Sequence, residues 1–252
     1  MLATQIAPGA GQKGKVTTML LEGRDFQIIK DYDQEMIVFE NFGSRVQKLY
    51  GEDAFCYGMT RARQVTLDEV NGVIRKKGSF GGNGDLQYMG EGYLIEYTAE
   101  TPTELSFIAS FSMRKNNSAK IVVIDDVEKY GGIKACNGAL LCMEPGIKLS
   151  VWNVSTQMVQ VGRFDSYMQE FAGSGTLIME LPSKVPVVKV KITKDHSAIF
   201  AAGTFGAMSS HLKLRTIPQE GNFLNNKLGH KIEVYTEDRE GYAWFVSGSP
   251  RM

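Results

Sequence analysis

The amino-acid sequence predicts an all-β fold, a pseudo-threefold repeat of short antiparallel sheets with one short helix near residues 67–77. Short apolar runs bounded by Gly, Asp, Asn or Pro recur along the whole chain, and runs of this length are typical of strands. Helix signals are confined to one segment. Two stretches also repeat one pattern of Gly, Met and apolar residues, which indicates a repeated structural unit.

The strand signals differ in strength along the chain. Val188, Val190 and Ile192 alternate with polar residues, which predicts a strand with one buried face. The β-branched run 121–124 predicts a strand buried on both faces. Residues 131–151 indicate two short strands joined by the turn 144–146. Further strands are expected at residues 16–21, 26–29, 36–39, 93–97, 105–111, 167–171, 176–181, 199–202, 212–214, 231–235 and 242–246, so that the total is about fourteen to eighteen.

The predicted helix follows a capping box. Thr66 and Glu69 have the spacing in which each side chain bonds the backbone N–H of the other residue. The basic residues 75–77 lie where the helix dipole favours cations, and Gly78 can end the helix. Four apolar residues then share one face: Leu67, Val70, Val73 and Ile74.

The internal repeat predicts the domain organisation. Residues 138–149 and 203–214 both place a Met five positions after a Gly and end on apolar-Lys-Leu. A second pattern recurs at Tyr93 and Tyr167, and residues 221–228 resemble a third, eroded copy. We therefore expect a flexible N-terminal arm at 1–15 and a single domain at 16–252. Its repeats are expected at 16–110, 118–181 and 185–250, closing on one another around a pseudo-threefold axis to bury their apolar faces.

Residues 90–99, 131–151 and 169–176 carry a resemblance to a known family. Their order of Gly and apolar positions resembles the mitochondrial-biogenesis family known for altered inheritance of mitochondria, whose bacterial members were long a domain of unknown function. Members of that family look like the tryptophan RNA-binding attenuation protein (TRAP) in fold, which implies a TRAP-like double-stranded β-helix or barrel. The family has no catalytic residues to transfer. Residues 50–77 depart from the family pattern, and we expect an insertion there.

Composition restricts the partners and the compartment. The 28 basic and 28 acidic residues balance, so a general attraction to nucleic acid or to an anionic membrane is not expected. The basic cluster of Arg61, Arg63 and 75–77 lacks interleaved aromatic residues and is interpreted as a solvated helix end. No apolar run reaches the roughly 20 residues of a membrane-spanning helix, and residues 1–15 do not resemble a secretory signal. A cytoplasmic protein is expected, mitochondrial if eukaryotic and located in the virion if from a phage.

The residues with reactive side chains do not form a known catalytic pattern. His196, His211 and His230 are not spaced as metal ligands. His211 follows Ser209 and Ser210, but the Gly-x-Ser-x-Gly motif of a nucleophile elbow is absent.

Three further groups also have structural interpretations. Asp125 and Asp126 are interpreted as a turn, and the glycine-rich residues 78–92 as a mobile loop without a phosphate-binding spacing. The three cysteines are too few for a disulfide framework. The apolar neighbours of Cys136 and Cys142 favour burial and a raised thiol pKa. We therefore expect no catalytic, metal-binding or cofactor-binding residue and no cofactor.

The hypothesis with most support from the sequence is a non-enzymatic β-scaffold that acts through oligomerisation and protein–protein binding. A homo-oligomer with protein partners is expected, without specific nucleic acid, and peripheral membrane contact is compatible with it. One alternative is a structural subunit of a phage or other large particle, such as a tail, capsid or baseplate component. Another is a carrier of a sugar or lipid in the mouth of a β-barrel.

Overall fold

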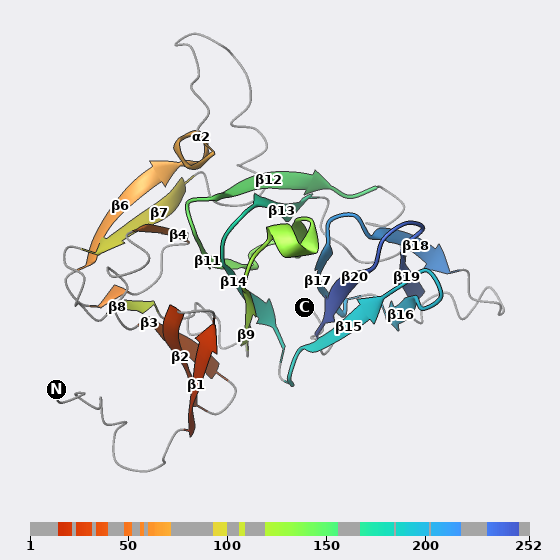
Figure 1. The fold of residues 1–252 in the computed structure, drawn as a ribbon, viewed down its shortest axis with the longest axis horizontal. Coiled ribbons are helices and arrows are strands. Elements are labelled where there is room, and N and C mark those ends of the chain that lie inside the picture. The colour runs from red at the N-terminus through yellow and green to blue at the C-terminus, as the bar shows by residue number, and fades with distance from the viewer. Residues whose placement is uncertain are drawn as a thin grey trace, which may run out of the picture.

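The computed structural model describes residues 15–21, 24–31, 34–39, 48–51, 56–57, 60–71, 93–99, 106–108, 119–155, 167–183, 185–201, 203–217 and 231–246. Most of these residues are in strands, so the predicted all-β class is confirmed (Figure 1). The two helical segments described are short, α2 (Leu67–Val70) and the 3₁₀ turn η2 (Glu128–Tyr130). The predicted arm, apart from Lys15, and the glycine-rich residues 78–92 lie outside the described residues.

The described strands, in chain order, are β1 (Lys15–Leu21), β2 (Arg24–Asp31), β3 (Gln34–Phe39), β4 (Lys48–Gly51), β5 (Cys56–Tyr57), β6 (Thr60–Thr66), β7 (Tyr93–Ala99), β8 (Ser106–Ile108), β9 (Ala119–Ile124), β10 (Ile133–Ala135), β11 (Leu140–Met143), β12 (Ile147–Asn153), β13 (Tyr167–Gly173), β14 (Leu177–Pro182), β15 (Val188–Ile192), β16 (Ala198–Ala201), β17 (Phe205–Ser209), β18 (Lys213–Ile217), β19 (Lys231–Tyr235) and β20 (Gly241–Phe245).

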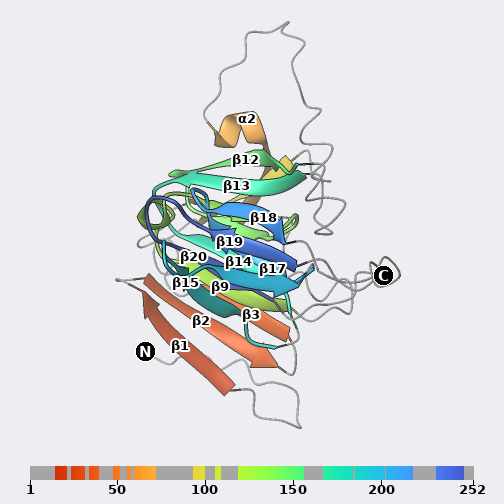
Figure 2. The same cartoon turned by 90° about the vertical axis from the view of Figure 1, so that its right-hand side faces the viewer.

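These strands form four antiparallel sheets. Two have six strands each, in the orders β6-β7-β4-β11-β14-β9 and β12-β13-β10-β17-β20-β15. A five-stranded sheet has the order β1-β2-β3-β8-β5, and a three-stranded sheet has the order β16-β19-β18. Figure 2 shows β12 and β13 across one end of the molecule and β1 and β2 at the other. No sheet closes on itself within the described residues, so the expected barrel is wrong for this structure.

The strand pairing repeats with a period of six strands. In β9–β14, the first and third strands pair with the sixth, and the second and fourth pair with the fifth. The same four pairings occur in β3–β8 and in β15–β20. Two further pairings, β4 with β11 and β10 with β17, join one copy to the next. The chain therefore contains three copies of one unit, preceded by the hairpin β1-β2.

The register aligns these copies residue by residue. One glutamate of the fifth strand occupies the same position in each copy: Glu96, Glu170 and Glu233. Its partners on the second strand are Tyr50, Lys134 and Ile199. Its partners on the fourth strand are Arg63, Ser150 and Arg215. The third counterpart of the Tyr93 and Tyr167 strands is therefore β19, and residues 221–228, where an eroded copy was expected, lie outside the described residues.

The start of the predicted helix is confirmed. The Glu69 N–H donates to Thr66 Oγ1 (3.3 Å), and the Thr66 N–H donates to Glu69 Oε2 (2.8 Å), which is the expected capping box. The described helix is four residues long, and Asn71 caps its end. Residues 72–77 lie outside the described part of the chain.

The expected insertion at 50–77 is wrong for its first half. Strands β5 and β6 in this segment pair with β8 and β7 and belong to the first copy. Strand β6 was not expected because its sequence, TRARQVT, is largely polar. Its hydrogen-bonded neighbour, which lies about thirty residues further along the chain, provides the stabilisation that its own side chains do not indicate.

Residues 131–151 contain three strands instead of the expected two. Strand β10 pairs with β17 of the next copy, whereas β11 pairs with β4 of the previous one. The turn 144–146 is confirmed, because the Ile147 N–H donates to the Glu144 carbonyl (3.1 Å). Every residue of β11 is buried. This segment therefore joins all three copies at the centre of the core.

Candidate binding groove

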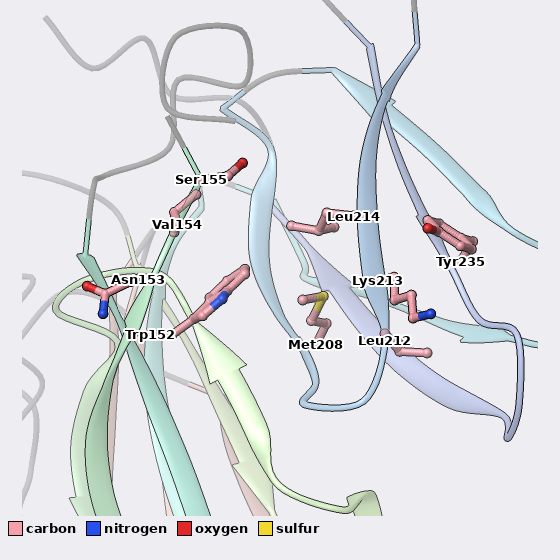
Figure 3. Close-up of a pocket in the computed structure, with 9 residues that line it drawn as sticks. All are labelled: Trp152, Asn153, Val154, Ser155, Met208, Leu212, Lys213, Leu214 and Tyr235. Carbon is pink, nitrogen blue, oxygen red and sulfur yellow. The ribbon is translucent and has the colours of Figure 1, made fainter. Parts of the chain in front are cut away.

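A groove of about 360 Å³ lies between the end of β12 and the strands β17, β18 and β19 (Figure 3). Three polar residues also contact it: Asn153, Ser155 and Lys213. Among the described strands, both β12 and β18 lie at the edges of their sheets, so the groove lies between two edge strands. Its apolar lining consists of Trp152, Val154, Met208, Leu212, Leu214 and Tyr235.

Trp152 contributes the largest side chain of the lining. Lys134 Nζ lies 5.0 Å from the centroid of the indole ring, and the Phe205 ring centroid lies 6.4 Å away. Lys134 also forms an ion pair with Glu170 (3.8 Å). A tryptophan held between a cation and a second ring loses little rotamer freedom on binding, which favours its use as a rigid contact surface.

The charged residues beside the groove are paired. Lys213 forms an ion pair with Glu237. Arg215 donates to Glu233 (2.5 Å), and its guanidinium carbon lies 4.7 Å from the Tyr235 ring centroid. The hydrogen bond from Arg215 lowers the pKa of the Glu233 carboxyl below its ordinary value. The rim therefore carries little net charge, and the groove offers a ligand both apolar and polar contacts.

The copies meet at two junctions, the first formed by β4 with β11 and the second by β10 with β17. The groove lies at the second junction, and the register shows which element lies at the corresponding place of the first. Leu214 in β18 is the counterpart of Leu149 in β12. The side chain of Asn71 bonds the Leu149 backbone twice: its Nδ2 donates to the Leu149 carbonyl (2.8 Å), and its Oδ1 accepts from the Leu149 N–H (3.0 Å). Leu67 and Val70 of α2 are buried in the core beside it. Helix α2 thus occupies the first junction, whereas the part of the second junction that the structure describes presents a groove.

The candidate Ser–His pair is not brought together. Ser209 Oγ accepts a hydrogen bond from the Tyr242 backbone N–H (3.1 Å). His211 Nε2 lies 3.1 Å from the Glu240 carbonyl oxygen, and its Nδ1 lies 3.2 Å from the guanidinium of Arg239. Burial, together with the nearby charge of Arg239, lowers the pKa of His211. Both side chains therefore have structural contacts.

The turn predicted at Asp125 and Asp126 is confirmed. Asp126 Oδ1 accepts from the backbone N–H groups of Glu128 and Gly175 (both 3.1 Å). Asp125 Oδ2 forms an ion pair with Lys129 (3.0 Å). Burial acts to raise the pKa of Asp125, but the hydrogen bond and charge of Lys129 outweigh it and lower the pKa. Among the described residues, no group of three or more His, Cys, Asp or Glu side chains forms a metal site.

The predicted burial of two cysteines is confirmed. Cys136 and Cys142 are buried, and neither forms a disulfide with another described residue. Burial, with a smaller contribution from the charge of Glu144, raises the pKa of the Cys142 thiol. His196 is exposed in a turn, while His230 and the basic residues 75–77 lie outside the described residues. No helix in the described part of the chain is long and apolar enough to cross a membrane.

Sequence reasoning did not identify the groove, although one signal was present. Trp152 lies on the polar side of an alternating strand, in register with Lys148 and Ser150. A large aromatic residue at such a position indicates a partly exposed apolar contact. The opposite wall could not have been found, because it comes from the next copy of the unit.

Comparison with known proteins gives support at the level of the fold. No protein-family model matches the chain. No curated protein matches it either. The crystal structure of protein SPYM3_0169 from Streptococcus pyogenes is similar, with a TM-score of 0.52 over 93% of this chain and 94% of that chain. The sequence identity is 12%, so the likeness concerns the fold alone.

Proposed function

We propose that this protein is a non-enzymatic β-scaffold that self-associates and binds protein partners through the groove between β12 and β18. The observation that carries the proposal is the difference between the two junctions. Helix α2 fills the first, and within the described residues the second leaves its apolar lining open at the corresponding place. A site built to hold a short chain segment and left open is suited to a segment from another protein.

The contacts of α2 define the chemistry of the expected partner. Leu67 and Val70 lie one helical turn apart and are both buried, and Asn71 follows directly. The partner segment should therefore present two apolar side chains three residues apart, followed by a side-chain amide. In the groove, the amide would bond the backbone of Leu214 as Asn71 bonds that of Leu149, and the apolar side chains would contact Trp152.

The structural contacts of the reactive residues also support a non-enzymatic role. Ser209 and His211 hold backbone groups, and Cys142 is fully buried. Buried thiols of raised pKa are poor nucleophiles, because the thiolate is the reactive form.

The experiment uses a fluorescent peptide of residues 64–72, which contains the α2 segment, added to the purified full-length protein. Anisotropy should show saturable binding with a Kd of about 0.1–1 mM, since two buried apolar side chains must offset the cost of association. Leu214→Glu should abolish the binding, whereas Lys148→Glu, an exposed change on β12, should leave it intact. A peptide with Asn71→Leu should bind more weakly than the parent.

Equal binding to wild type and Leu214→Glu would mean that the peptide does not use the groove. Self-association is measured separately, by light scattering over a range of protein concentrations. A monomer mass at every concentration would remove that part of the proposal. The particle-subunit alternative is tested by looking for the protein in purified virions.

A further inference from the structure

Three asparagines of the chain are followed directly by a glycine: Asn71, Asn83 and Asn137. In such a pair, the side-chain amide lies near the backbone nitrogen of the next residue, and glycine has no Cβ to keep the two apart. The structure describes Asn71 and Asn137 and holds their amides differently. We propose that Asn137 is a site of spontaneous deamidation, at which the backbone nitrogen of Gly138 displaces the side-chain amide, and that the fold protects Asn71.

The backbone at Asn137 leaves the attacking nitrogen accessible. Asn137 and Gly138 form the turn between β10 and β11, which the Ala139 N–H closes by donating to the Cys136 carbonyl (3.2 Å). Gly138 is exposed, and a Cβ at its position would meet no atom within 4 Å. Among the described residues, the Gly138 N–H has no hydrogen-bond partner. The nitrogen that must attack is therefore neither covered nor held by a hydrogen bond within the described chain.

The two amides differ in what holds them. The Oδ1 atom of Asn137 is buried and has no hydrogen-bond partner in the described part of the chain, so rotation of the amide sacrifices no hydrogen bond of that oxygen. Asn71 donates from Nδ2 to the Leu149 carbonyl (2.8 Å) and accepts at Oδ1 from the Leu149 N–H (3.0 Å). The amide of Asn71 must break both hydrogen bonds before it can approach the nitrogen of Gly72.

The reaction needs water as its only co-reactant. The Gly138 nitrogen forms a bond to the side-chain carbonyl carbon of Asn137, and the proton that this nitrogen loses leaves with the amide nitrogen as ammonia. Water then opens the cyclic imide, at the side-chain carbonyl to give aspartate or at the main-chain carbonyl to give isoaspartate. No group is oxidised or reduced. Both products carry a carboxylate in place of the amide, and isoaspartate adds one carbon to the path of the backbone.

The modification acts on the centre of the fold. Strand β10 pairs with β17 of the next copy, and β11 pairs with β4 of the previous one. A carboxylate at the buried position of Oδ1, where no partner is described, is costly. The extra backbone carbon of isoaspartate also changes the turn that connects the two strands. Deamidated protein should therefore be less stable than fresh protein, so this turn limits the lifetime of the folded chain.

The next copy of the unit supplies a matched variant. In the turn between β16 and β17, the Thr204 N–H donates to the Ala201 carbonyl (3.2 Å), as Ala139 does to Cys136. Gly203 has a φ of 85°, close to the 71° of Gly138. The residue before Gly203 is alanine in the sequence. The turn thus does not require asparagine, and Asn137→Ala should fold normally without being able to deamidate.

The test incubates the purified full-length protein at physiological temperature and slightly alkaline pH, followed by digestion and mass spectrometry at successive times. Deamidation raises the mass of a fragment by about 1 Da, and chromatography separates aspartate from isoaspartate. Position 137 should convert at least about tenfold faster than position 71, whose two hydrogen bonds must break first. Asn153, exposed but followed by Val154, controls for exposure alone and should stay intact. Asn83 lies outside the described residues and is measured as a separate fragment.

A parallel incubation in urea separates the effect of the fold from that of the local sequence. Without the fold, positions 71 and 137 should convert at similar rates, because both precede glycine. An intact Asn137 after prolonged incubation of the folded protein would overturn the proposal, and so would equal rates at 71 and 137. A tenfold difference that persists in urea would overturn the protection of Asn71 by the fold.

The effect on stability is measured on the same samples. The urea midpoint of the wild type should fall as incubation proceeds, whereas that of Asn137→Ala should change less. An equal fall in both proteins would refute the conclusion that position 137 limits the lifetime of the folded chain.

Discussion

Replacing Asn71 with alanine isolates the contact that holds α2 against β12. The substitution removes both side-chain hydrogen bonds to the Leu149 backbone, at 2.8 and 3.0 Å. It leaves the helix itself intact, because the backbone N–H of Asn71 still donates to the Leu67 carbonyl (2.9 Å). Asn71 has αR dihedral angles (φ −82°, ψ −3°), which alanine adopts without strain.

The expected loss of stability follows from these two hydrogen bonds. Each contributes about 0.5–1.5 kcal/mol net, so Asn71→Ala should lower the free energy of unfolding by about 1–3 kcal/mol. For a chain of 252 residues, this corresponds to a fall in Tm of about 2–6 °C. Asn71→Asp should be at least as destabilising, because a carboxylate oxygen would then face the Leu149 carbonyl oxygen without a hydrogen to share.

Urea unfolding followed by tryptophan fluorescence, together with calorimetry, measures both variants. Asn153→Ala is the matched control, since it makes the same change at an exposed position in the groove and should shift stability by less than about 0.5 kcal/mol. If Asn71→Ala and Asn153→Ala were equally mild, the amide would not anchor α2. The partner chemistry inferred for the groove would then lose its basis.

Two further predictions concern titratable side chains, the buried Cys142 and the half-buried His211. Cys142 should react with an aromatic disulfide reagent only at the rate of unfolding, because the side chain is fully buried and its pKa is raised. Cys142→Ser should lower the free energy of unfolding in urea by about 1–2 kcal/mol. Fast labelling of the folded protein would contradict the burial of Cys142. The lowered pKa of His211 means that the unfolded chain binds more protons near pH 6, so stability should fall as the pH drops from about 7 toward 5. His211→Gln should flatten this dependence of stability on pH, whereas a change at the exposed His196, His196→Gln, should not. Equal slopes of stability against pH in the wild type and both variants would refute the role of His211.

The match between sequence pattern and structure depends on how local each signal is. The Thr66–Glu69 capping box and the turn 144–146 involve residues three apart or fewer, and both are formed as predicted. Strand β6 was missed because its stability comes from pairing with β7, more than thirty residues away at Arg63 and Glu96. Burial of Cys142 could be predicted from its apolar neighbours, since every residue of β11 is in the core.

The groove could not be predicted in this way. Trp152 and Leu214 lie on opposite walls of the groove and belong to different copies of the unit. Contacts of this kind depend on how the copies are placed in space, and no periodicity within one strand encodes that placement.

Local patterns in the sequence thus determined the β class, the start of the helix, the turns and the burial of the central segment 131–151. These features depend on side-chain periodicity and on backbone bonds between near neighbours. The sequence also indicated three repeats, but only the tertiary structure decided which strands pair within and between them, that α2 fills one junction and that a groove lies at the next. The physical reason is that antiparallel pairing between distant strands is set by the hydrogen bonds and packing of whole sheets, which become defined only when the copies meet.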